Sequence, residues 1–192
     1  MVDDIDEDWF VFFFEKAKLI SDESMQQIWG KLLAFRVNGN SNINKKLLYT
    51  FSLMENKDVE LFCTLCAMTF EDLSKPGGMY PFIYIREYPA YYNNFGIRRY
   101  NLAELDNLGL IEYDTHSKFV LPANVPLLGY GDYEIELESD TRIQNGNVRF
   151  TKLGQTLYRI TKVDSQDKFI EHCKKVWDAL GIGYRIKKKN VS

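Results

Sequence analysis

The chain has 192 residues, of which 45% are hydrophobic, 15% aromatic and 27% charged. These fractions are typical of a packed globular protein and exclude a mainly disordered chain. No run of about 18 apolar residues occurs, and the amino end is acidic where a signal peptide is basic, so we expect a cytoplasmic protein without membrane contact.

The net charge of −3 is divided unevenly along the chain. Residues 1–96 hold 9 Lys and Arg against 14 Asp and Glu, whereas residues 97–192 hold 15 against 13. Neither half is basic enough to indicate nucleic-acid binding by charge alone, because phosphate contacts need a dense positive surface. The three cysteines have no secretory context and are expected to stay reduced.

Residues 1–74 are predicted to form a helical subdomain. Apolar residues recur at helical spacing in four stretches, which are residues 6–20, 22–37, 44–54 and 58–68. The first stretch is so rich in aromatic side chains, from Trp9 to Phe14, that we expect it to be buried on most of its circumference. Ser21 is the expected N-cap of the second helix.

Ser74-Lys-Pro-Gly-Gly78 is the predicted boundary within the chain, because its proline and paired glycines interrupt the helical pattern. Beyond it, residues 79–192 are predicted to mix helices and strands. This part begins with a strand at residues 82–86. A turn-rich segment at residues 88–94 then leads into a helix that ends at Leu108.

Gly109 is the centre of this second part. It follows a short helix with one apolar stripe, at the position where a helix C-cap needs positive φ, and Leu110–Tyr113 alternate as a strand does. About 40 residues later, Thr151 is the expected cap of another short amphipathic helix. A β segment between two such helices is the arrangement at the wing end of a winged-helix domain. The stripes consist of Leu102, Leu105 and Leu108 in the first helix and of Leu153, Leu157 and Ile160 in the second.

The predicted wing is larger than a simple hairpin. Strands are expected at residues 110–113 and 118–121, on either side of a turn, and Asn145-Gly146 predicts a tight hairpin turn into Val148–Phe150. Residues 132–138 alternate without a fault. The acidic row Glu134, Glu136 and Glu138 is expected to be the solvated face of an edge strand, although it could hold a cation or a basic partner.

A helix at residues 166–180, ended by Gly181, is expected to close the chain with a strand at residues 184–186 and a basic tail at residues 187–189. We therefore predict an α+β protein, in which an N-terminal helical subdomain packs on a winged-helix-like domain with an enlarged β wing and a C-terminal helix. The predicted domains are residues 1–74 and residues 79–192.

Two resemblances accompany this prediction. Leu-x-x-Leu-Gly-Leu-Ile at residues 105–111, followed by Phe-Thr-x-x-Gly-x-x-Leu at residues 150–157, resembles the recognition helix, wing and next helix of bacterial winged-helix regulators. The stretch from residue 8 to residue 34 is similar to a widespread bacterial family catalogued only as a domain of unknown function, and this resemblance spans most of the chain. It brings no catalytic motif. Members usually have Leu where this chain has Phe150, and they are typically longer at the amino end.

Metal and catalytic motifs are sparse. Cys63-Thr-Leu-Cys66 has the spacing of a zinc or redox pair, and His172-Cys173 could complete four ligands. Adjacent helical residues point about 100° apart, however, and the first pair falls in an apolar helical run, so we expect buried thiols and no metal site.

Of the two histidines, His116 is predicted to lie in a turn and His172 on a polar helix face, so no catalytic triad is visible. The chain has no glycine-rich phosphate loop. We expect neither a catalytic site nor a cofactor, and no small-molecule substrate is evident.

The aromatic segment at residues 80–95 is the strongest candidate for a binding surface. Exposed tyrosines stack on bases and arginines contact phosphates, which would suit nucleic acid. Tyrosine and arginine are also enriched in protein interfaces, and so many aromatic residues can equally form the edge of a core. The candidates for a protein interface are Tyr88, Tyr91, Tyr92 and Arg86.

DNA binding is the alternative. Arg98 and Arg99 are near the start of the predicted recognition helix, as groove contacts require, but Glu104 and Asp106 on the same helix would repel phosphates. Three further residues, on the wing, could contact the DNA backbone, namely Lys118, Arg142 and Arg149. We expect a non-catalytic interaction module that assembles with another protein or with itself, with a DNA-binding regulator as the alternative and a hydrolase using the acidic strand as a third possibility.

Overall fold

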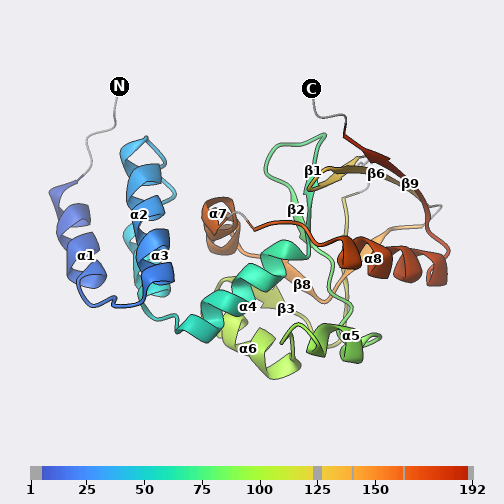
Figure 1. Cartoon of the computed structure of the whole chain (residues 1–192), viewed down its shortest axis with the longest axis horizontal. Helices are drawn as coiled ribbons and strands as arrows, with labels where there is room; N and C mark the ends of the chain where they lie inside the picture. Colours follow the sequence, from blue (N-terminus) through green and yellow to red (C-terminus); the bar gives the residue numbers. More distant parts are fainter. Residues whose placement is uncertain (1–5, 123–126, 140, 162, 190–192) are drawn as a thin grey trace.

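A computed structural model of the chain describes residues 6–122, 127–139, 141–161 and 163–189. Four helices come first, as predicted (Figure 1). Their bounds are Glu7–Ala17 for α1, Glu23–Val37 for α2, Lys45–Ser52 for α3 and Asn56–Ala67 for α4.

Side chains at the helix starts explain where these helices begin. Asp22, and not Ser21 as predicted, caps α2, because its carboxylate accepts the N–H of Met25 at 2.9 Å. Asn44 caps α3 in the same way through the N–H of Leu47. At α4, Glu55 and Asp58 form a capping box in which each side chain accepts a backbone N–H of the other.

α1 buries only one of its sides, so the expectation that it is covered on most of its circumference is wrong. Trp9 is buried and its Nε1–H donates to the carbonyl oxygen of Ile43 at 2.8 Å, and the Phe13 ring packs edge-on against Trp29 of α2. Val11 and Phe14 are each 57% exposed. The reason is position, because α1 packs on α3 and is the outermost helix at one end of the molecule (Figure 1).

α4, which the sequence groups with the first three helices, packs against two later helices. These are α6 (Arg99–Asn107) and α7 (Lys152–Thr161). The Phe62 ring lies 5.5 Å from that of Phe150, and the Cys66 thiol lies 3.6 Å from the Thr161 hydroxyl. The helical part and the β part therefore share one continuous apolar core, which extends from Trp9 to Trp177.

Five strands form an antiparallel sheet in the order β2-β1-β5-β6-β9. The predicted boundary at residues 74–78 joins the paired strands β1 and β2, so the division into residues 1–74 and 79–192 passes through a hairpin and stays a prediction. The strands are β1 (Thr69–Asp72), β2 (Met79–Pro81), β5 (Leu128–Tyr130), β6 (Tyr133–Glu138) and β9 (Gly183–Lys188).

β6 is not the edge strand that the sequence predicted, because β9 pairs along its whole length. Glu134 lies opposite Lys187, and Arg185 of β9 lies 2.7 Å from the Glu138 carboxylate. The basic partner of the acidic row is therefore a strand of the same chain. Part of the predicted basic tail belongs to this strand, since residues 187 and 188 lie in β9.

Two short ribbons complete the β structure, and their pairing differs from the prediction. β3 (Ile111–Tyr113) pairs with β8 (Val148–Phe150), and β4 (Phe119–Val120) pairs with β7 (Gln144–Gly146). The strands before and after residues 114–117 thus pair with later strands and not with each other.

Asn145-Gly146 is not a hairpin turn. Gly146 has a φ of 104°, and a Cβ on it would collide with the carbonyl oxygen of Ile83. A close approach of two backbones, and not a reversal of the chain, requires glycine here.

The predicted strand at residues 82–86 is also displaced, because β2 ends at Pro81. After Pro81, the Tyr92 hydroxyl binds backbone groups that a neighbouring strand would otherwise bind. It accepts the N–H of Tyr84 at 3.1 Å and donates to the carbonyl oxygen of Phe82 at 3.0 Å. Tyr92 belongs to the short helix α5 (Pro89–Asn93), which occupies the segment predicted as turns.

The predicted C-terminal end of α6 and the predicted start of α7 are confirmed. Gly109 has a φ of 72° and stops α6 before β3, and the Thr151 hydroxyl accepts the N–H of Gly154 at 3.1 Å. α8 (Asp167–Ala179) is followed by Gly181, with a φ of 66°, as predicted. The described part of the chain is thus a mixed α+β fold of eight helices and antiparallel sheets, in which no helix is both long and apolar enough to cross a bilayer.

Candidate functional site

The tyrosines predicted to form an interface lie mostly inside the protein. Tyr92 is fully buried, so it cannot contact a partner, and Tyr88 and Tyr91 are half-buried. All three rings pack around His172, which stacks on Tyr91 with ring centroids 3.6 Å apart and an interplanar angle of 7°. Arg86 is exposed and donates to the carbonyl oxygen of His116 at 2.9 Å.

His172 is buried, so its predicted place on a polar helix face is wrong. Burial and the nearby charge of Lys175 lower the pKa of His172 to about 4. The ring is therefore neutral near pH 7, and its Nε2 lies 3.2 Å from the Tyr92 hydroxyl. This enclosed, uncharged ring packs as part of the core.

The predicted DNA contacts divide into two groups. Lys118 lies 2.8 Å from the Glu87 carboxylate, and Arg149 donates through Nε to Glu112 at 2.9 Å, so carboxylates of the chain already balance both charges. Arg98 and Arg99 are exposed at the start of α6, and Arg142 is exposed before β7.

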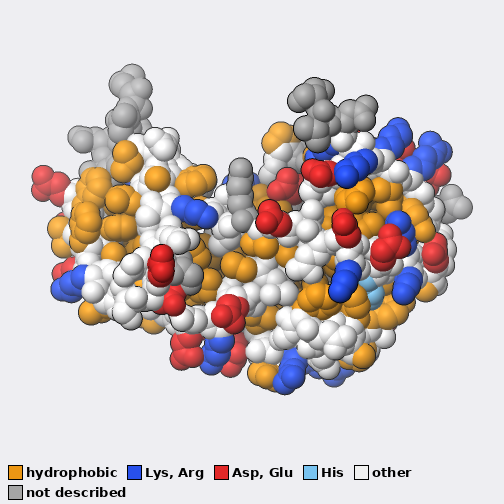
Figure 2. Space-filling view, viewed as in Figure 1, with side chains coloured by type: hydrophobic (Ala, Val, Ile, Leu, Met, Phe, Trp, Pro, Cys, Tyr) orange, Lys and Arg blue, Asp and Glu red, His pale blue; other side chains and the backbone are white. Residues whose placement is uncertain are grey.

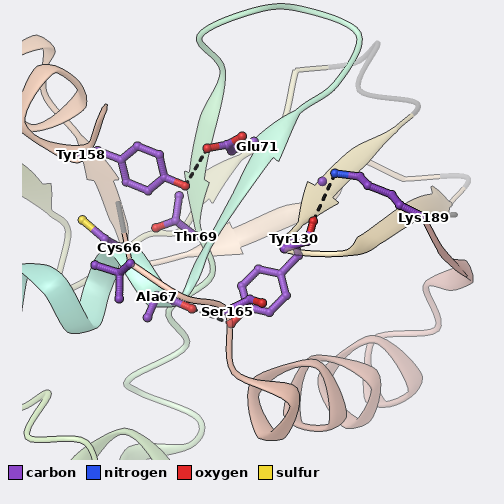
Figure 3. A pocket seen from close by; sticks show the side chains of 11 residues that line it. Cys66, Ala67, Thr69, Glu71, Tyr130, Tyr158, Ser165 and Lys189 are labelled. Atoms are coloured by element: carbon purple, nitrogen blue, oxygen red, sulfur yellow. Dashed lines mark hydrogen bonds between the residues drawn. The ribbon is translucent and has the colours of Figure 1, made fainter. Parts of the chain in front are cut away.

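A polar cavity of about 200 Å³ lies beside β1, where α4 ends (Figure 3). The Tyr158 hydroxyl donates to Glu71 at 3.0 Å, and the Lys189 ammonium donates to the carbonyl oxygen of Gly131 at 3.1 Å. The Tyr130 hydroxyl donates to Ala67 O at 2.6 Å and accepts the N–H of Gln166 at 2.9 Å. These hydrogen bonds around the cavity connect the end of α4, the sheet and the segment before α8.

All three cysteines are free thiols: Cys63 and Cys66 lie one turn apart on α4, and Cys173 lies on α8. Cys66 and Cys173 are buried and Cys63 is half-buried, and burial raises the pKa of each thiol. In the part of the chain that the structure describes, no group of three or more His, Cys, Asp or Glu side chains is placed to hold a metal ion.

An exposed apolar side of α1 was not identified from the sequence, which predicted burial. This side, called the α1 outer face below, carries a shallow depression lined by Phe10, Val11, Phe14, Glu15, Ala17 and Lys18. Figure 2 shows hydrophobic side chains gathered at this end of the molecule. The signal was present in the sequence, because these apolar residues form a helical stripe of their own beside the buried stripe of Trp9 and Phe13.

Comparison with known proteins gives one match. The family described as a protein of unknown function, DUF2806, matches residues 1–174. The match includes α1 and ends before β9. Neither the curated proteins nor the solved structures gave a match.

Proposed function

We propose that this chain, which belongs to the DUF2806 family, is a non-catalytic interaction module that assembles with another protein chain through the α1 outer face. One observation carries the proposal: Val11 and Phe14 are each 57% exposed and lie side by side on a helix at the end of the molecule. Contiguous exposed apolar surface of this kind marks interaction sites, because covering it removes apolar area from water.

The charges around this face support a specific contact. Glu7, Asp8 and Glu15 are exposed on α1 beside the apolar residues, and so is Lys18. An apolar centre with a charged rim is the usual anatomy of a protein interface, in which the rim selects the partner and the centre supplies affinity.

The state of the candidate catalytic groups supports the non-catalytic part of the proposal. His172 is enclosed by tyrosines, and the raised pKa values of Cys66 and Cys173 keep their thiols protonated near neutral pH. A buried, protonated thiol is a poor nucleophile.

We further propose a winged-helix arrangement for residues 56–161. The order supports it: helix α4, strands β1 and β2, helices α5 and α6, strand β3, a wing, strand β8 and helix α7. The bridge between Ile83 and Gly146 also supports it, because it lays the segment after β2 beside the returning side of the wing. In this interpretation, the enlarged wing consists of residues 114–122, 127–139 and 141–147, and its strands β5 and β6 pair with β1 and β9.

A photo-crosslinking amino acid in place of Val11 tests the interaction proposal in cells that make the full chain. We expect a discrete crosslinked product from position 11. The matched control is the same amino acid at Tyr100 of α6, which is 59% exposed and outside the proposed surface. If position 11 yields only uncrosslinked chain, or the same products as position 100, the proposal is wrong.

DNA binding is the second candidate function, and the exposure of Arg98 and Arg99 at the start of α6 favours it. In a winged helix this end of the recognition helix faces the groove. A mobility-shift titration at several salt concentrations tests it. Salt-sensitive retention that is lost in the Arg98→Ala, Arg99→Ala double variant would favour DNA, whereas an equal loss in Arg149→Ala alone would not be expected because Glu112 already holds that side chain.

A further inference from the structure

We infer that the partner of the α1 outer face is the same helix of a second copy of this chain, packed antiparallel across a two-fold axis. The inference rests on the proposed function, since it names the partner of the same surface. Four exposed side chains of α1 and its C-cap carry it, and they are Glu7, Val11, Phe14 and Lys18.

The spacing of these four side chains is that of a helix-pairing stripe. Successive steps of four, three and four residues keep side chains on one side of an α-helix, as in the seam of a coiled coil. The spacing also reads the same in both directions. An antiparallel copy therefore presents the same stripe back to the first helix.

The chemistry of the stripe fits this symmetry. With a two-fold axis between residues 12 and 13, Val11 of one copy lies against the partner's Phe14, and Glu7 lies against the partner's Lys18. Each contact occurs twice, as a two-fold interface requires. A parallel pair would instead place Glu7 against Glu7 and Lys18 against Lys18, which costs like-charge repulsion.

Three charged side chains near the stripe, Asp6, Asp8 and Lys16, have contacts within the chain. Asp6 and Asp8 each lie 3.8 Å from the ammonium of Lys45 on α3, and the Lys16 ammonium lies 5.5 Å from the ring centre of Tyr49. These groups are held against the chain itself. Antiparallel packing also sets the positive end of one helix dipole beside the negative end of the other.

The size of the surface sets the expected strength. An 11-residue helix is about 16 Å long, whereas stable protein interfaces bury roughly 800 Å² on each partner. A contact along one helix is smaller than that. We therefore expect a reversible dimer with a dissociation constant on the order of 10 µM.

Sedimentation equilibrium of the full chain, from below to well above that concentration, tests the inference. We expect a monomer–dimer equilibrium for the natural chain. In Val11→Ser with Phe14→Gln, association should weaken at least about tenfold, because the apolar centre of both halves is lost. Tyr100→Gln is the matched control, since it removes an equally exposed aromatic side chain from α6 and should leave the dissociation constant unchanged.

Charge exchange tests the antiparallel arrangement. Glu7→Lys alone and Lys18→Glu alone each create two repulsive contacts, and each should weaken association by roughly tenfold at low salt. The combined variant should recover the natural constant to within about threefold. Circular dichroism of each variant at a concentration where the chain is monomeric shows whether α1 is still folded.

Two results would overturn the inference: a natural chain that stays monomeric at the highest concentration, or a combined variant as weak as the single ones. The first leaves the proposed function intact if photo-crosslinking at position 11 still yields a product with a different protein. Both ideas fail together only if the chain is monomeric and position 11 gives no specific product.

Discussion

Two aromatic stretches of this chain have opposite fates. From Trp9 to Phe14 the helix α1 lies at the end of the molecule and leaves Val11 and Phe14 more than half exposed, although the sequence predicts burial on most sides. Residues 80–95, called the tyrosine segment below, were the strongest candidate for a binding surface, with the edge of a core as the alternative, and Phe82, Tyr84 and Tyr92 are buried.

Burial of an aromatic segment therefore depends less on its aromatic content than on how many sides of it are covered by other elements of the fold. α1 has packing partners on the side of α2 and α3. The tyrosine segment is enclosed by the β7–β8 region and by α8, whose Trp177 ring lies 5.7 Å from that of Phe82. Polar groups assist, because the Tyr92 hydroxyl satisfies backbone groups that would otherwise be buried without partners.

Gly146→Ala should produce the largest effect, because the new Cβ would collide with the carbonyl oxygen of Ile83 in the tyrosine segment. We expect the free energy of unfolding to fall by about 4 kcal/mol or more. Gly39→Ala is the control: Gly39 also has positive φ, 89°, but open space around it, so its cost should be only about 1 kcal/mol. Urea denaturation compares the two, and equal losses would mean that close packing at Ile83 is unimportant.

The stability of the protein should depend on pH through His172. Its pKa is about 4 in the folded chain and about 6.5 when unfolded, so the unfolded state takes up a proton first as pH falls. Above pH 6.5 the ring is neutral in both states and does not lower the stability. As the pH falls from 6.5 to 4, the free energy of unfolding decreases by up to about 3 kcal/mol. Denaturation midpoints at pH 7.5 and 4.5 measure it. His172→Phe should show a smaller pH dependence than the natural chain, and an unchanged one would contradict the assignment.

Tyr92→Phe should destabilise the protein by about 2 kcal/mol, because the N–H of Tyr84 and the carbonyl oxygen of Phe82 would each lose a buried partner. Tyr49→Phe, at a side chain that is 51% exposed, should change the stability by less than about 0.5 kcal/mol. Thermal unfolding of both variants makes the comparison. A Tyr92→Phe variant as stable as the control would show that these hydrogen bonds are replaceable.

The smallest effect is expected on α1, where adjacent phenylalanines form a matched pair. Phe14→Ala should alter the unfolding free energy of the monomer by about 0.5 kcal/mol, because Phe14 is 57% exposed. Phe13→Ala should cost about 3 kcal/mol or more, because Phe13 is 4% exposed. Denaturation at submicromolar concentration keeps association out of the measurement. Similar losses would mean that Phe14 also packs on the core in solution.

Elements whose signals are local could be predicted from the sequence. Gly109 and Gly181 stop their helices, and Thr151 caps α7, because each effect involves residues within one helical turn. The N-cap of α2 was misplaced by one residue, from Asp22 to Ser21, but the larger failures depended on distant partners. The pairing of β4 with β7 and the enclosure of Tyr92 involve residues far apart in the chain, and no short pattern encodes them.

The candidate surfaces also depended on contacts between distant parts of the chain. The apolar stripe on α1 was visible, but which stripe stays outside depends on where α2 and α3 pack. At Asn145-Gly146 a strong turn signal was overridden, since the glycine serves the contact with Ile83. Arg98 and Arg99, which the sequence placed near the start of a helix, are exposed at the start of α6.

The place of β9 in the sheet has a consequence for synthesis. β6 pairs with β9, the last strand that the structure describes, so this edge of β6 stays open until residues 183–188 have left the ribosome. Open edges recruit strands from other nascent chains. Glu134, Glu136 and Glu138 disfavour such pairing, because they repel the same carboxylates on a neighbouring chain. Once β9 has been synthesised, Arg185 and Lys187 form ion pairs with carboxylates of this row and stabilise the pairing of β9 with β6.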